Sequence, residues 1–105
     1  MKPYLSVIIP AYNEAKRLPL TLIDIDKHLK NADFFYEIIV VNNNSTDATI
    51  EVVERFSHII KNLKLIECHI VGKGAAVKKG MLEARGKIRI FTDADNSTSI
   101  DQFQK

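Results

Sequence analysis

The sequence has 105 residues, of which 46% are hydrophobic, so it is one domain or part of one and can form a core. Its 15 Lys and Arg residues nearly balance its 13 Asp and Glu residues, so the overall charge does not indicate a nucleic-acid partner. The single cysteine, Cys68, excludes an internal disulfide and is expected to be buried. No stretch has the roughly eighteen apolar residues of a membrane span, and we expect neither a span nor a signal peptide.

The first half of the chain predicts two strands, each followed by a helix. A strand is predicted at residues 5–10. In the helix that follows, Pro19 takes a position near the start, and apolar residues recur at helical spacing, namely Leu18, Leu22, Ile25 and Leu29. A second strand is predicted at residues 37–41. Ser45 or Thr46 is expected to cap the next helix, with Asp47 near its positive end and an inward face of Ile50, Val53 and Phe56.

The second half repeats the strand and helix order. A third strand is predicted at residues 63–66 and a helix from about residue 74 to residue 85, which Gly86 is expected to end in a left-handed conformation. A fourth strand is predicted at residues 88–92. The strand segments are nearly continuous in apolar residues, as in parallel strands covered on both faces. The sequence therefore predicts an α/β domain with an open, mainly parallel sheet and helices on both faces.

Asp93 and Asp95 follow the fourth predicted strand. Because side chains alternate along an extended backbone, the two carboxylates can point the same way and together hold a hard cation such as Mg²⁺ or Mn²⁺. Taken alone, these residues are more typical of a turn than of a metal site. However, polar loops also follow the other strands, at residues 10–14, 42–47 and 69–74, and the carboxyl ends of parallel strands form the ligand-binding crevice of an open sheet.

Four motifs in this order, at residues 6–14, 40–49, 72–81 and 84–86 followed by 93–95, resemble the nucleotide-sugar-binding half of family 2 GT-A glycosyltransferases. The resemblance is strongest to the branch that transfers glucose or mannose to polyprenyl (dolichyl) phosphate, and it covers nearly the whole chain. It implies a Rossmann-like fold and a donor site at the carboxyl ends of the strands. By this resemblance the nucleotide and its sugar are bound by Pro10, Ala11, Tyr12, Glu14, Asn43, Lys73 and Asp93, and the metal by Asp93 and Asp95.

The chain departs from the family after the second strand, where Asn42-Asn43-Asn44-Ser45 replaces the common Asp-Asp-Gly-Ser. An amide both donates and accepts hydrogen bonds, whereas a carboxylate only accepts, so Asn43 is expected to bind the base less selectively. Asn44 in place of glycine is a milder change, because Asn tolerates a left-handed backbone.

The resemblance implies transfer of a hexose from a nucleoside diphosphate sugar of the UDP-glucose or GDP-mannose type to a lipid phosphate or glycan acceptor. In the family the acceptor-binding part lies beyond the Asp-x-Asp motif, so we expect a truncated domain, residues 1–105, with no catalytic residue of its own. We expect the protein to be cytoplasmic or, if the chain is part of a longer protein, to lie at the cytoplasmic face of a membrane. The longer protein would then associate with that membrane. An exposed strand edge predicts homo-oligomers.

Other readings fit less well. The glycines at 72, 74 and 80 do not have the spacing of a dinucleotide fingerprint, no P-loop pattern is present, and the first loop lacks the acidic cluster of a receiver module. The alternative that stays open is a non-catalytic module that binds a nucleotide sugar without transferring it.

Overall fold

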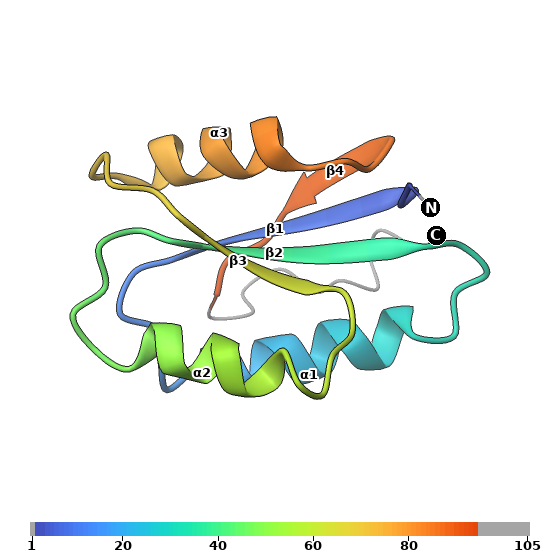
Figure 1. The fold of residues 1–105 in the computed structure, drawn as a ribbon, viewed down its shortest axis with the longest axis horizontal. Helices are drawn as coiled ribbons and strands as arrows, with labels where there is room; N and C mark the ends of the chain where they lie inside the picture. The colour runs from blue at the N-terminus through green and yellow to red at the C-terminus, as the bar shows by residue number, and fades with distance from the viewer. Residues whose placement is uncertain (1, 95–105) are drawn as a thin grey trace.

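A computed structural model describes residues 2–94 of the chain, which form one sheet between two helical layers (Figure 1). The four strands are β1 (Leu5–Ala11), β2 (Tyr36–Asn42), β3 (Leu63–Glu67) and β4 (Ile88–Phe91). They pair in the order β3-β2-β1-β4, and every pairing is parallel. This confirms the predicted parallel sheet, with strand ends within one residue of the predicted positions.

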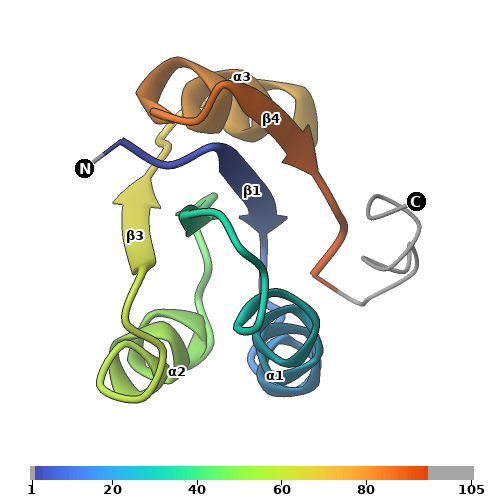
Figure 2. The same cartoon turned by 90° about the vertical axis from the view of Figure 1, so that its right-hand side faces the viewer.

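The three helices lie on both faces of the sheet, as predicted. Helices α1 (Leu18–Leu29) and α2 (Thr49–Phe56) cover one face, and α3 (Lys73–Glu83) covers the other (Figure 2). Successive side chains of a strand point to opposite faces of the sheet, so the core has two parts. Val7 and Ile9 pack toward α1 and α2, whereas Ile8 and Ile39 pack toward α3. Cys68 belongs to the α3 side of the core and is buried, as expected.

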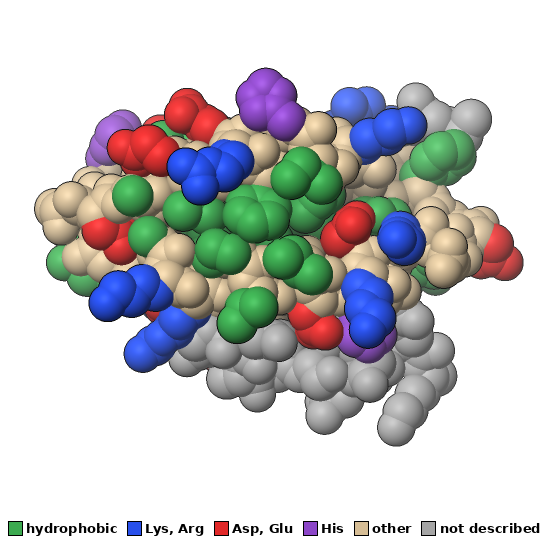
Figure 3. Space-filling model, turned by 90° about the horizontal axis from the view of Figure 1, so that it is seen from below, with side chains coloured by type: hydrophobic (Ala, Val, Ile, Leu, Met, Phe, Trp, Pro, Cys, Tyr) green, Lys and Arg blue, Asp and Glu red, His purple; other side chains and the backbone are tan. Residues whose placement is uncertain are grey.

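Helix α1 follows its predicted pattern closely. Pro19 lies in its first turn, where the missing backbone N–H costs nothing, and the four predicted inward residues are buried, namely Leu18, Leu22, Ile25 and Leu29. Leu20 and Ile23 lie on its exposed side. Seen from below, the face made by α1 and α2 has hydrophobic side chains near its middle and charged ones around them (Figure 3). Within residues 2–94, every helix is too short or too polar to cross a membrane.

The predicted start of α2 was wrong. Neither Ser45 nor Thr46 caps the helix, which begins at Thr49 with Ala48 before it and no side-chain cap. Both residues instead contact Asn13 in the loop after β1, so the chain between β2 and α2 is used to join two loops. The inward face is close to the prediction, since Val53 is buried, Phe56 packs against the core and Ile50 is half-buried.

The predicted role of Gly86 was also wrong. It does not adopt a left-handed conformation, and α3 ends before it with Ala84 extended. A Cβ at Gly86 would lie 2.5 Å from Ser6 Oγ and 2.7 Å from the Ser6 backbone nitrogen. Glycine is therefore required here because the backbone passes against β1 on its way into β4.

The buried carboxylate of Glu37, in β2, links three other segments at the amino end of the sheet: β1, β3 and the chain before β4. Glu37 accepts hydrogen bonds from the Ser6 hydroxyl (2.6 Å) and the Arg85 backbone N–H (2.7 Å), and Lys64 Nζ lies 2.9 Å away. Ser6 Oγ accepts in turn from the Gly86 N–H. Burial acts to raise the pKa of Glu37, but these bonds outweigh it and the pKa lies below its usual value.

Candidate functional site

A cleft of about 240 Å³ opens at the carboxyl ends of the strands. It is formed where β1 and β4 end, by the loop after β2 and by the start of α3, and its lining residues are Pro10, Ala11, Tyr12, Glu14, Asn43, Lys73, Ala76, Asp93 and Ala94. All seven residues predicted to bind the donor lie around this one cleft. Ala76 and Ala94 were not predicted there, because small apolar residues give no chemical signal of a binding site, and Ala11 was predicted only through the family resemblance.

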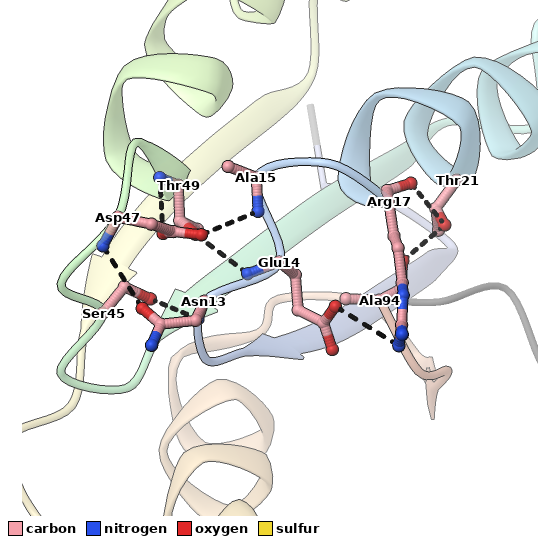
Figure 4. Close-up of polar contacts among 9 residues, drawn as sticks. All are labelled: Asn13, Glu14, Ala15, Arg17, Thr21, Ser45, Asp47, Thr49 and Ala94. Carbon is pink, nitrogen blue, oxygen red and sulfur yellow. Dashed lines mark hydrogen bonds and ion pairs between the residues drawn. The ribbon is translucent and has the colours of Figure 1, made fainter.

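The segment after β1 enters the cleft wall and then starts α1. Tyr12 is exposed, and Glu14 is half-buried. The Glu14 carbonyl accepts a hydrogen bond from the N–H of Leu18, which is the first residue of α1. The Glu14 carboxylate lies 3.8 Å from the Arg17 guanidinium (Figure 4). Glu14 therefore combines a place in the cleft wall with a structural role at the start of α1.

The loop after β1 is tied to the loop after β2 through Asn13, a residue that sequence analysis did not single out. Asn13 Oδ1 accepts hydrogen bonds from the N–H groups of Thr46 (2.7 Å) and Asp47 (3.2 Å), and its own N–H donates to Ser45 Oγ (Figure 4). Its φ of 53° places it in the left-handed region that Asn tolerates. An Asn just after a strand was the signal that could have found it.

Asp47 makes the second tie between these loops. Its carboxylate accepts hydrogen bonds from the N–H groups of Ala15 (3.2 Å) and Thr49 (3.0 Å) and from the Thr49 hydroxyl. Desolvation acts to raise the pKa of Asp47, but these hydrogen bonds outweigh it, so the pKa lies below its usual value and the group is ionised at neutral pH. The Thr49 hydroxyl in turn accepts from the Glu14 N–H, which holds the cleft wall in place.

Asn43 connects the loop after β2 to the loop between β3 and α3. Its Nδ2 donates to the carbonyls of Cys68 (3.1 Å) and Ile70 (2.8 Å), and its Oδ1 accepts from the Gly72 N–H (3.0 Å). The side chain is buried, and both of its N–H groups have protein partners. The neighbouring Asn44 has a φ of 62°, which is the left-handed backbone that Asn tolerates.

Asp93 lies opposite the start of α3, where Lys73 Nζ is 2.5 Å from its Oδ1. The backbone is fixed on both sides of Asp93. The Thr92 N–H donates to the Ile8 carbonyl. The buried Thr21 hydroxyl donates to the Ala94 carbonyl (Figure 4). These contacts hold a half-buried carboxylate at the cleft, and the Lys73 ammonium group beside it balances its charge.

The predicted metal site can be described only in part. Asp93 supplies a hard oxygen donor of the kind that Mg²⁺ and Mn²⁺ prefer, so the residue fits such an ion. Asp95, its predicted partner, lies outside the described residues. Within residues 2–94 no three His, Cys, Asp or Glu side chains are grouped as a complete set of metal ligands. An ion at Asp93 would therefore need further ligands from elsewhere, such as phosphate oxygens.

Comparison with known proteins places these features in a family. The chain is 41% identical over 107 residues to a dolichyl-phosphate beta-glucosyltransferase of Trichomonas vaginalis, covering 96% of this chain and 33% of that protein. It spans about a third of the length of the curated relatives it matches.

Two solved structures share the fold over 90% of the chain, each with a TM-score of 0.75, and the chain covers 28% of each of them. One is TarS of S. aureus in complex with UDP, at 32% identity. The other is the mannosyltransferase PcManGT of Pyrobaculum calidifontis in complex with GDP-Man and Mn²⁺, at 33% identity. The family model for glycosyl transferase family 2 matches residues 6–105. The chain belongs to glycosyl transferase family 2.

Proposed function

We propose that this chain is the donor-binding part of a glycosyltransferase that moves a hexose from a nucleoside diphosphate sugar to polyprenyl phosphate. The observation that carries the proposal is the cleft at the carboxyl ends of the strands, where the seven predicted donor-site residues come together from four separate segments of the chain. The names of the matched relatives favour a glucosyl donor, and the two solved structures bind a uridine and a guanosine nucleotide.

The cleft has the chemistry that a nucleoside diphosphate needs. Tyr12 offers an exposed aromatic ring for the base, next to the apolar wall of Pro10 and Ala11. Lys73 begins α3, so the positive end of the helix dipole and an ammonium group lie together at the cleft. Both attract the negative charge of a diphosphate. These residues therefore have the charge and shape to orient the donor.

A divalent metal would be held by Asp93 and, by the family resemblance, Asp95. When bound, it would neutralise the negative charge that develops on the departing diphosphate. A phosphate acceptor is already an anion at neutral pH and therefore needs little help from a general base. We propose that the acceptor is bound by parts of a longer protein, at the cytoplasmic face of a membrane.

The test is calorimetric titration of the 105-residue chain with UDP-glucose and GDP-mannose, with and without Mn²⁺. We expect one donor to bind in a metal-dependent way. Asp93→Asn should lower its affinity at least about tenfold, the loss of one charge-assisted interaction. Asp33→Asn is the matched control, because Asp33 is an exposed carboxylate away from the cleft. A folded chain that binds neither donor at millimolar concentration would overturn the proposal.

The non-catalytic binding module remains the second candidate, because the chain covers about a third of its relatives and we assign no catalytic residue within it. The two functions differ in one measurement. Transfer of radiolabelled sugar from the donor to polyprenyl phosphate, by the longest protein that contains this segment, supports the enzyme. Binding without any transfer by that protein supports the module.

A further inference from the structure

Both N–H donors of the Asn43 side-chain amide are hydrogen-bonded within the protein. Its two N–H groups point at two carbonyl oxygens, of Cys68 and Ile70, and its oxygen faces the Gly72 N–H. These partners fix the orientation of the amide, because the reverse orientation would bring N–H groups against N–H and oxygen against oxygen. Toward any ligand the side chain has only one lone pair of Oδ1 left to offer.

The three partners span the loop between β3 and α3, at its first, third and last residues. Cys68, at the start of this loop, is buried in the core, but Ile70 and Val71 are 71% and 84% exposed, so apolar packing contributes little to the second half of the loop. Gly72 has a φ of 124°, which only glycine adopts readily, and it immediately precedes Lys73 at the start of α3. The position of the loop, and with it the position of Lys73 at the cleft, therefore depends strongly on the buried amide.

We infer that Asn43 is a positioning residue of the donor site, which holds the β3–α3 loop and the start of α3 at the cleft and does not donate a hydrogen bond to the nucleobase. The inference rests on the proposed function for the identity of the ligand. It departs from the expectation that an amide at this position reads the base less selectively than a carboxylate. Any direct contact of Asn43 with the base is then limited to the one remaining lone pair of Oδ1, which can only accept a hydrogen bond.

The test compares Asn43→Asp with the matched control Asn44→Asp. A carboxylate at 43 has no N–H, so it leaves two carbonyl oxygens unpaired and places a negative charge beside them. Asn44 is exposed, and its amide makes one long contact of 3.3 Å with the His69 carbonyl, so the same change should have little effect there. Affinities for UDP, GDP and CDP, and hydrogen exchange of the Gly72 amide, are measured in each protein.

We expect Asn43→Asp to weaken the binding of UDP, GDP and CDP by the same factor, about tenfold or more. The factor should be the same because the variant protein has lost the ordered loop that all three nucleotides need. Exchange of the Gly72 amide should rise by a similar factor, and Asn44→Asp should change each quantity less than about twofold. If thermal melting shows that Asn43→Asp does not fold, Asn43→Ala, which removes the bonds without adding charge, takes its place.

Two results would overturn the inference. One is a change in the ratio of UDP to GDP or CDP affinity without a change in Gly72 exchange, which would mean that the amide reads the base directly. The other is an unchanged Gly72 exchange rate in both Asn43 variants, whatever the nucleotide affinity. If the native chain binds no nucleotide, the proposed function fails, but the exchange measurement still decides whether Asn43 holds the loop.

Discussion

Replacing Gly86 by Ala tests whether the backbone before β4 is held against β1. The added Cβ would lie 2.5 Å from Ser6 Oγ, 2.7 Å from the Ser6 nitrogen and 2.9 Å from the Leu5 carbonyl carbon. Two of these are backbone atoms of a central strand, so the strand connection must move rather than a flexible side chain. That movement also disturbs the 2.8 Å bond from the Gly86 N–H to Ser6 Oγ.

The expected loss of stability follows from these contacts. Overpacking a tight site costs about 1–3 kcal/mol, and a disturbed buried hydrogen bond costs about 1 kcal/mol more. We therefore expect Gly86→Ala to lower the free energy of unfolding by about 2–4 kcal/mol, a large part of the stability of a small domain. The assay is urea denaturation of the 105-residue chain followed by circular dichroism.

Gly74→Ala is the matched control for this measurement. Gly74 lies within α3, and a Cβ there would meet no atom within 4 Å, so the same change should stabilise the helix by up to about 1 kcal/mol. Gly86→Asn adds a second control, because Asn would be tolerated only if the site needed a left-handed backbone. A Gly86→Ala protein as stable as the native chain, or a tolerated Gly86→Asn, would refute the close-contact reasoning.

Three further predictions concern other parts of the chain. The pKa of Glu37 is lower in the folded state, so its contribution to the free energy of unfolding is present above the pKa of the unfolded chain and is lost as pH falls below about 4.3. Glu37→Gln should therefore lower the free energy of unfolding, measured with urea, by about 2 kcal/mol at pH about 7 and by progressively less toward pH about 3. Asp47→Ala should cost about 1 kcal/mol, because the Thr49 N–H loses its acceptor, and an unchanged melting temperature would contradict this. The edge strand β4 exposes Ile88 and Phe91, so sedimentation should show concentration-dependent self-association that Ile88→Lys reduces; a clean monomer of the native chain would contradict it.

The order of strands and helices, and their arrangement in layers, follow from the amino-acid sequence. Continuous runs such as Val7-Ile8-Ile9 specify strands covered on both faces, because local side-chain type alone decides how much of each strand must be buried. Since parallel strands end at the same edge of a sheet, this layout also brought Tyr12, Asn43 and Asp93 to one cleft. The position of Pro19 and the left-handed backbone of Asn44 likewise followed from local chemistry.

The contacts of individual side chains depend on the folded arrangement of the whole chain. Ser45 resembles a helix cap in sequence, but its hydroxyl accepts from Asn13, 32 residues away. Gly86 resembles a helix terminator, but it is needed because Ser6 lies against it. The donors of Asn43 are taken by carbonyls 25 and 27 residues further along the chain. Such contacts depend on how loops meet after the sheet has formed, and residue type does not encode which partner is nearest.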